Sequence, residues 1–364
     1  MCRRRRKIVF SDGKKYLTGA LISAIIESSQ ARRTDGAGTY CEMKIRKGVE
    51  HMKKVYAAGE VLIDFIAGRK GEAENAGVFY RNAGGAPANV AVCVSKLGGK
   101  SAVITKLGND MFGKFLKETL EKAGVDTEYV RFTDEANTAL AFVSLDENGE
   151  RSFSFYRKPS ADMLLGAADV ADVSFDTTDV LHFGSVDLID APVRKAHDAL
   201  IEKARKSGAT VSFDPNLRYS LWKSKDELLE TVRRYIPLAD VIKVSEEELA
   251  DITGEADMKK AAVSLLGGNV KLAIVTMGAA GATAYTKEAE VYVPSEKAER
   301  VADTTGAGDS FVGATLYQLV ENGFDISAAA LKRILTYANK TAGYVVGRAG
   351  AIPAMPTGKE IFGK

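Results

Sequence analysis

The sequence predicts an α/β fold in which helices flank a mostly parallel central sheet. From Met52 onward, short apolar runs alternate with segments whose apolar residues recur at helical spacing. Several runs are apolar throughout, which is typical of strands buried on both faces of a parallel sheet. Alternation of this kind favours right-handed crossover units around one sheet. The expected strands span residues 54–63, 101–107, 179–185, 209–214, 240–245 and 271–278.

Capping residues indicate where the expected helices begin and end. Asp110 suits the N-cap of a helix that Gly124 ends, because a short acidic side chain accepts hydrogen bonds from the first free backbone N–H groups. Pro87 suits the first turn of another helix. The same apolar spacing predicts further helices over residues 191–207 and 225–236.

One region departs from this alternation. Residues 137–157 alternate apolar and polar side chains around Asn148 and Gly149, a pattern typical of a β-hairpin. Together with residues near 64–81, they are expected to form a small sheet outside the core. Such a sheet can cover a pocket as a lid and exclude water from it. No repeat or low-complexity linker interrupts the pattern, so residues 52–364 are expected to form one domain with a lid.

The composition is that of a globular protein without an excess of charge. A net charge of +2 gives no sign of a nucleic-acid or membrane partner. No apolar run reaches the length of about eighteen residues that a membrane-spanning helix needs. The three cysteines lack metal-ligand spacing, which is typical of a reducing, cytoplasmic compartment.

Residues 1–51 are expected to be an N-terminal extension rather than part of the domain. Four arginines and a short apolar run resemble a secretory signal, but no small-residue cleavage site follows them. A clear strand pattern opens just after Met52, and residues 47–51 are compatible with a purine-rich, ribosome-binding coding stretch. We therefore expect the extension either to be disordered or to come from a start codon upstream of the true one.

The strongest functional signal is the string VADTTGAGDSFVGA, residues 301–314. Gly306 and Gly308, with Ala307 between them, leave the main chain open to a ligand where a helical pattern begins. The unpaired N–H groups and partial positive charge of a helix N-terminus bind anions. Asp309 lies in that first turn, where a carboxylate can take a proton from an alcohol that attacks a phosphate. Taken alone, GAGD is also compatible with an ordinary helix start.

The longer string DTTGAGDSFVGA resembles the C-terminal signature of the ribokinase (PfkB-type) family of sugar kinases. The resemblance implies a ribokinase-like, three-layer core with a mostly parallel central sheet, and a small β-sheet lid through which many members form homodimers. It also implies that Asp309 is the catalytic base and that the backbone of Gly306, Ala307 and Gly308 forms the anion hole. The chain has neither G-x-x-x-x-G-K-[ST] nor a strand-linked G-x-G-x-x-G, which argues against P-loop and dinucleotide-binding proteins.

Residues 82–113 resemble the N-terminal signature of the same family, around the string GGAPAN. Gly84 and Gly85 would let a sugar lie against bare backbone, and Asn89 can both donate to and accept from its hydroxyls. Asp64 offers a carboxylate acceptor for neighbouring hydroxyls. Alone, GGAPAN also fits a turn before a helix, but its position between Asp64 and DTTGAGD favours the kinase interpretation.

Two further strings bear on the choice of sugar. FYRKPSADMLL (155–165) and DPNLRYSLW (214–222) look most like the fructokinase branch, although 2-keto-3-deoxygluconate kinases carry similar elements. Arg157 can donate hydrogen bonds to a hydroxyl, carboxylate or phosphate, and the alternative is a solvated arginine in the hairpin. Asn216 and Arg218 are expected to face the substrate or the phosphates.

The expected nucleotide side lies in the C-terminal half of the chain. KVSEEE (243–248) occupies the place of the family's Asn-x-x-Glu element, with Lys243 replacing the asparagine and Glu246 retained. Lysine is compatible with phosphate contact, and Glu246 is expected to act on Mg²⁺ through water, because magnesium keeps several waters. An acidic first turn of a helix is the alternative. The string VTMGAAGA resembles the strand and turn along ATP, with the residues Thr276, Gly278 and Gly281.

Two further assignments involve the C-terminal part of the chain. Asn339 and the segment GRAGAIPAMPT resemble the adenine wall and part of a monovalent-cation loop, whose other part is Asp303 and Thr305. They imply K⁺ as a second ion beside Mg²⁺. Small and apolar residues there are equally compatible with packing.

Together these observations predict an ATP-dependent kinase that phosphorylates a primary hydroxyl of a sugar. Fructose, giving fructose 6-phosphate, is the expected substrate, and the acidic sugar 2-keto-3-deoxygluconate is the alternative. A non-catalytic, sugar-binding regulator of the same fold is the alternative of another class. The presence of Asp309 and of the GAG string argues against a regulator.

Overall fold

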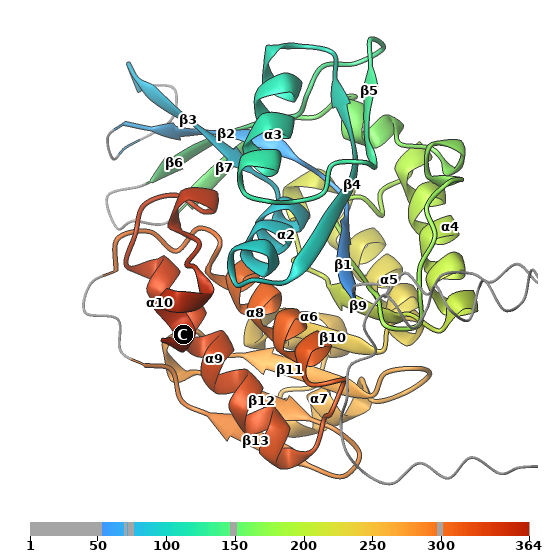
Figure 1. The fold of residues 1–364 in the computed structure, drawn as a ribbon, viewed down its shortest axis with the longest axis vertical. Coiled ribbons are helices and arrows are strands. Elements are labelled where there is room, and N and C mark those ends of the chain that lie inside the picture. The colour runs from blue at the N-terminus through green and yellow to red at the C-terminus, as the bar shows by residue number, and fades with distance from the viewer. Residues whose placement is uncertain (1–52, 69–70, 72–75, 146–150, 297–300, 364) are drawn as a thin grey trace, which may run out of the picture. The chain divides into compact units, whose positions relative to one another are not determined.

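A nine-stranded, mostly parallel sheet forms the centre of the computed structural model, which describes residues 53–68, 71, 76–145, 151–296 and 301–363 (Figure 1). Its strand order is β13-β12-β11-β10-β9-β8-β1-β4-β5, and only the β11–β12 and β12–β13 pairs of these described strands are antiparallel. The sheet confirms the predicted α/β class. The strands are β1 (Lys54–Ala58), β4 (Lys100–Gly108), β5 (Val130–Thr133), β8 (Val180–Gly184), β9 (Thr210–Asp214), β10 (Val241–Ser245), β11 (Leu272–Thr276), β12 (Ala282–Tyr285) and β13 (Glu290–Val293).

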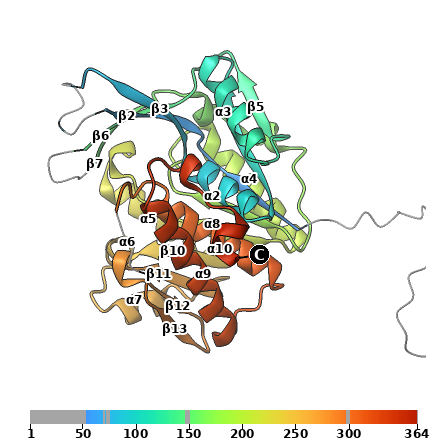
Figure 2. The ribbon, with the colours of Figure 1, turned by 60° about the vertical axis from the view of Figure 1, so that its left-hand side comes forward.

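Helices cover both faces of this sheet and make the three layers (Figures 1 and 2). Along β1, Val55 and Ala57 belong to one apolar core while Tyr56 and Ala58 belong to the other, because successive strand side chains point to opposite faces. The first core includes α2 (Ala86–Lys96), α3 (Met111–Lys122), α8 (Ala307–Glu321), α9 (Ala328–Val346) and α10 (Gly358–Phe362). The second includes α4 (Pro192–Ser207), α5 (Lys225–Tyr235), α6 (Glu246–Thr253) and α7 (Met258–Ser264).

The predicted helix boundaries are confirmed where capping residues marked them. The Asp110 carboxylate accepts hydrogen bonds from the backbone N–H groups of Phe112 (2.9 Å) and Gly113 (2.8 Å), and so caps α3. Pro87 lies in the first turn of α2. Within the described residues, no helix has both the length and the apolar character needed to cross a membrane.

A separate four-stranded sheet stands apart from the central one, with the order β3-β2-β6-β7 (Figure 1). Its strands are β2 (Leu62–Ala67), β3 (Phe79–Gly84), β6 (Leu140–Leu145) and β7 (Arg151–Tyr156). The antiparallel pairing of β6 with β7 confirms the predicted hairpin. The turn residues Asn148 and Gly149, like the proposed extension at residues 1–51, lie outside the described residues.

The single strand predicted over residues 54–63 is wrong, because the chain changes sheets there. Strand β1 ends at Ala58, and β2 of the small sheet begins at Leu62. Gly59, with φ of 144°, makes the bend, and a methyl group on it would lie only 2.7 Å from Pro87 Cγ. An apolar run gives no sign of such a bend, since both halves of it are buried. Because of this bend, Glu60 lies just beyond the carboxyl end of β1.

Candidate active site

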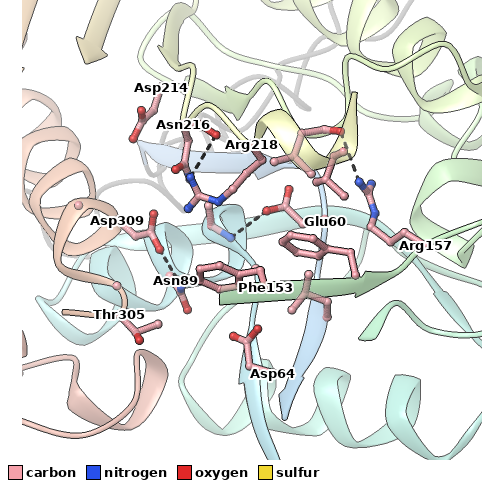
Figure 3. A pocket seen from close by; sticks show the side chains of 18 of the residues that line it. Glu60, Asp64, Asn89, Phe153, Arg157, Asp214, Asn216, Arg218, Thr305 and Asp309 are labelled. Carbon is pink, nitrogen blue, oxygen red and sulfur yellow. Dashed lines mark hydrogen bonds between the residues drawn. The ribbon is translucent and has the colours of Figure 1, made fainter. Parts of the chain in front are cut away.

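A cavity of about 190 Å³ lies where the carboxyl ends of the parallel strands, the small sheet and the N-terminus of α8 meet (Figure 3). This is the edge at which open α/β sheets bind their ligands. Residues predicted from sequence line much of it: Asp64, Gly85, Asn89, Arg157, Asn216, Arg218, Lys243, Thr305, Gly306, Gly308 and Asp309.

Several lining residues were missed from sequence. Two aromatic rings of the small sheet, Phe153 and Phe155, project into the cavity from β7. Glu60 and Asp214 follow or end central strands, and bring two further carboxyl groups to the cavity. The one available signal was position, because polar residues at the carboxyl ends of buried strands converge in space.

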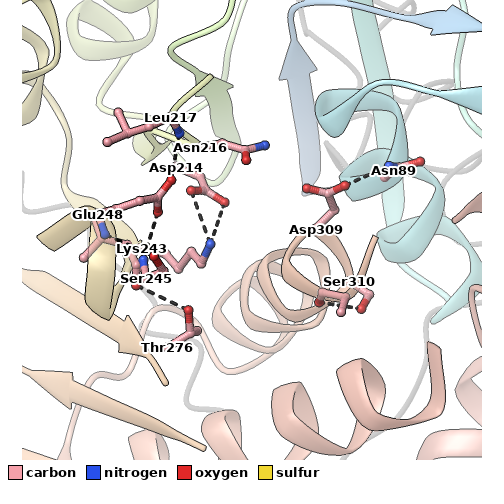
Figure 4. Close-up of polar contacts among 12 residues, drawn as sticks. Asn89, Asp214, Asn216, Leu217, Lys243, Ser245, Glu248, Thr276, Asp309 and Ser310 are labelled. Carbon is pink, nitrogen blue, oxygen red and sulfur yellow. Dashed lines mark hydrogen bonds and ion pairs between the residues drawn. The ribbon is translucent and has the colours of Figure 1, made fainter. Parts of the chain in front are cut away.

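Asp309 lies in the first turn of α8 and points into the cavity (Figures 3 and 4). Its Oδ2 accepts a hydrogen bond of 2.7 Å from Asn89 Nδ2, on α2. Removal from bulk water raises the pKa of Asp309 to about 6, although the Asn89 hydrogen bond opposes this, and the nearby Asp214 charge adds to it. A carboxylate with this pKa is ionised at neutral pH and basic enough to accept a proton.

The turn before Asp309 depends on a glycine. Gly306 caps α8 in the left-handed region, with φ of 77°, and a methyl group on it would lie 2.8 Å from Ala351 Cβ. Gly306 and Gly308 both line the cavity, and because neither has a side chain, the backbone at the start of α8 is accessible from the cavity. Ala307, the first residue of the helix, does not line it.

The pKa of Asp309 predicts an acid limit to activity. If Asp309 must be ionised to accept a proton, kcat should fall as the pH drops through about 6, by about tenfold per pH unit below it. A pH–rate profile between pH 5 and 8, with the nucleotide and sugar saturating, measures this. A profile that stays level to pH 5 would contradict a base of this pKa.

Lys243 brings a positive charge to the same end of the cavity. Its Nζ lies 3.2 Å from Asp214 Oδ2, and a methyl group on Gly308 would lie 3.6 Å from that Nζ (Figure 4). Burial alone lowers the pKa of Lys243, but the carboxylates of Asp214 and Glu248 outweigh it and raise that pKa. The ammonium group therefore remains charged beside the N-terminus of α8.

Two glutamates in the first turn of α6 differ in their surroundings. The predicted Glu246 is exposed, whereas the charge of Glu248 helps to raise the pKa of Lys243, and neither side chain lines the cavity. Glu248 closes a capping box with Ser245 and accepts a hydrogen bond of 2.7 Å from the Leu217 N–H. It thereby fixes the 214–218 loop, which carries Asn216 with a positive φ of 46° and Arg218.

Arg157 lines the cavity but is neither solvated nor free. It is 4% exposed, and its guanidinium pairs with both Asp162 and Asp187. Its Nε donates to Asp162 Oδ2 at 2.8 Å. The sequence did not show this pairing, since nothing marked Asp162 of the same string as a partner and Asp187 lies thirty positions later.

The two glycines before α2 are required by close packing. A methyl group on Gly84 would overlap the Asp64 carboxylate at 2.0 Å, and one on Gly85 would lie 2.4 Å from the Glu60 carbonyl oxygen. Gly85 and Asp64 line the cavity, whereas Gly84 lies beneath Asp64. The pair thus brings a carboxylate and bare backbone side by side.

Residues 52–358 match the pfkB family of carbohydrate kinases. The chain belongs to this family. It is 44% identical over 307 residues to a probable fructokinase-5 of Arabidopsis thaliana, covering 83% of this chain and 94% of the relative.

Solved structures of carbohydrate kinases are similar to this chain. A fructokinase of Xylella fastidiosa with bound ATP has a TM-score of 0.77 at 36% identity, covering 85% of this chain and 97% of that one. A fructokinase of Vibrio cholerae, bound to fructose, ADP and calcium, also has a TM-score of 0.77 at 36% identity, covering 86% and 98%. The family match and these similarities show that the chain is an ATP-dependent carbohydrate kinase.

Among the residues predicted to bind the nucleotide, Lys243 lines the cavity of this kinase, whereas Thr276, Gly278, Gly281 and Asn339 lie outside it. Thr276 ends β11, and its Oγ1 donates to the Val244 carbonyl at 3.4 Å. Gly281 directly precedes β12, and a methyl group on it would lie 2.2 Å from the Val293 carbonyl oxygen. Asn339 donates to that same oxygen at 3.0 Å, so its amide secures the end of β13. Gly278 lies in the turn between β11 and β12, where its φ is 52°.

The predicted cation loop is held by its acidic residue. Asp303 Oδ1 accepts hydrogen bonds from the N–H and the hydroxyl of Thr305, at 2.8 and 2.7 Å. Its Oδ2 accepts from the Gly350 N–H at 2.9 Å. The two segments named in the prediction are therefore adjacent, and monovalent-cation binding by them stays a prediction.

Proposed function

We propose that this pfkB-family kinase transfers the γ-phosphoryl group of ATP to a primary hydroxyl of fructose, giving fructose 6-phosphate. The observation that carries the proposal is Asp309 at the N-terminus of α8, joined to Asn89 across a cavity that also holds Lys243. The similarity to fructokinases over more than four fifths of the chain supports fructose as the sugar.

In the proposed reaction, the sugar lies against Gly85 and Asp64, and Asp309 accepts the proton of its primary hydroxyl. The hydroxyl oxygen attacks the γ-phosphorus in line, while N–H groups of Gly306, Ala307 and Gly308 stabilise the developing charge. The ammonium group of Lys243 adds positive charge beside them. The rings of Phe153 and Phe155 cover the cavity and keep water from competing with the sugar.

A magnesium ion would be held at this site by the phosphates of the nucleotide and by few protein carboxylates. Mg²⁺ keeps several waters and is held by phosphates and one or two carboxylates, where it neutralises phosphate charge. The described residues contain no group of three or more His, Cys, Asp or Glu side chains arranged to hold a metal ion. We propose that Glu248, because it faces Lys243, has the water-mediated role predicted for Glu246.

The charges at the sugar end favour a neutral sugar over an acidic one. Arg157, the guanidinium buried there among the described residues, is already paired with two carboxylates. Asp64 lines the same end, so a carboxylated sugar would meet a like charge. No observation favours 2-keto-3-deoxygluconate.

Three further proposals concern context. Exposed apolar side chains on the small sheet, Val78, Tyr80 and Tyr156, support a homodimer formed through this lid. The junction of Asp303 with Gly350 supports a K⁺ loop. The cysteine usage supports a cytoplasmic location.

The test is ADP release by the full chain with MgATP and, separately, fructose, ribose, glucose and 2-keto-3-deoxygluconate. We expect selective turnover of fructose, lost when EDTA removes the magnesium. Turnover of only the acidic sugar would overturn the choice of sugar and keep the mechanism. Silence on all four sugars, from folded protein that binds ATP, would favour the non-catalytic regulator.

A further inference from the structure

Two buried carboxyl groups lie behind the sugar end of the cavity. Glu60 is 6% exposed and Asp187 is 1% exposed. Asp187 lies beside the backbone that precedes Glu60, since a methyl group on Gly59 would lie 3.4 Å from Asp187 Oδ2, and the Asp187 charge raises the pKa of Glu60. Glu60 lines the cavity, whereas Asp187 lies behind it.

The charges around this pair do not balance when every carboxyl is ionised. Arg157 is the cation that contacts the pair, and it already binds Asp162 and Asp187. Asp187 uses Oδ1 for that contact, and its buried Oδ2 has no hydrogen-bond donor among the described residues. An ionised Glu60 would place a third buried negative charge against one positive charge, which is costly.

We propose that Glu60 and Asp187 share one proton, and that this pair positions the first turn of α2 for the sugar. The Glu60 O–H donates to the unpartnered Asp187 Oδ2, while Glu60 Oε1 accepts the Ala86 N–H at 3.1 Å. Gly85 and Ala86 line the cavity, so the pair connects the sugar-binding turn to Asp187 and Arg157. The inference rests on the proposed function, since it assumes that the sugar binds at this turn.

Two histidine rings are buried in the surrounding core. The His197 Nδ1–H donates to the Val193 carbonyl at 2.9 Å, and its Nε2 has no hydrogen-bond partner among the described residues. Burial lowers the pKa of His182, so that ring is neutral at pH 7. Burial, then the Asp187 charge, raises the pKa of Glu60, while Arg157 opposes this. The remaining charged groups that face the cavity are Asp64, Asp214, Arg218, Lys243 and Asp309.

A titration of sugar binding tests the shared proton. We expect the sugar KM of the wild-type chain to rise at alkaline pH, by about tenfold per pH unit once the proton leaves, with the ATP KM unchanged. In Glu60→Gln the amide N–H₂ donates to Asp187 and its oxygen accepts from Ala86. The sugar KM of that variant should therefore be close to the wild-type value at pH 7 and should stay level to pH 9.5. The matched control Glu118→Gln, at an exposed ion pair with Lys122, should keep the wild-type profile.

Two results would overturn the shared proton: a wild-type sugar KM that is level from pH 6 to 9.5, or an alkaline rise that persists in Glu60→Gln. If Glu60→Gln does not fold, Asp187→Asn replaces it. Loss of the Asp187 charge should move the alkaline rise to lower pH, and an unmoved rise would count against the pair. Failure of the proposed function is separate, because it appears as absent fructose turnover by the wild-type chain at every pH. The titration then uses whichever sugar is turned over.

Discussion

Replacing Asp309 with asparagine is expected to lower kcat by about 100-fold or more, which is the usual contribution of a general base. Asparagine has the same shape, and its amide oxygen still accepts the hydrogen bond from Asn89. The sugar and ATP should therefore bind nearly as in the wild type. Turnover is measured by ADP release, and binding of each ligand by calorimetry.

The matched control for this change is Asp190→Asn, at an aspartate whose side chain is 75% exposed. The control should keep wild-type turnover, because its carboxylate forms only a long, exposed contact with Arg194. The residual activity of Asp309→Asn should also lose the acid limit near pH 6. Near-wild-type turnover in Asp309→Asn would remove Asp309 from the role of base.

The turn that we propose to be catalytic could be located from sequence because the residues that form it are local. Gly306, Gly308 and Asp309 lie within four positions of one another, and the glycines themselves indicate a backbone conformation that other residues rarely adopt. Asn89 lies 220 positions away from Asp309, yet the GGAPAN string, a second local motif, predicted that it belongs to the same site. Motifs of this kind are short enough to be read without any knowledge of the fold.

What could not be predicted depends on distant pairing. Arg157 reads as a free guanidinium, because nothing in its neighbourhood shows that Asp187, thirty positions later, will neutralise it. Glu60 lies in an apolar run that indicated one strand, and only the bend at Gly59 makes it a cavity residue. The role of Glu246 stays a prediction. Residues two apart on a helix point in different directions, and the sequence alone does not show that the charge of Glu248 acts on Lys243.

Removing the guanidinium of Arg157 is expected to have the largest effect on stability. Arg157→Met keeps an unbranched side chain of similar length but leaves Asp162 and Asp187 buried without a cation. Breaking a buried ion pair from one side costs about 3–5 kcal/mol of unfolding free energy, since the remaining charges stay desolvated. Urea denaturation at pH 7, by fluorescence and circular dichroism, measures the loss.

The matched control is Lys206→Met, because Lys206 pairs with Glu202 and the two side chains are 72% and 64% exposed. An exposed pair contributes about 0–1 kcal/mol, so the control should differ little from the wild type. Burial raises the pKa of Asp187, while Arg157 opposes that rise. Without Arg157 the pKa rises further, so Arg157→Met should regain part of its stability as the pH falls and the buried carboxyls take up protons. Equal losses in the two variants, or a loss that grows toward pH 5, would mean that Arg157 does not hold these carboxylates. The charge imbalance from which the shared proton was inferred would then disappear with it.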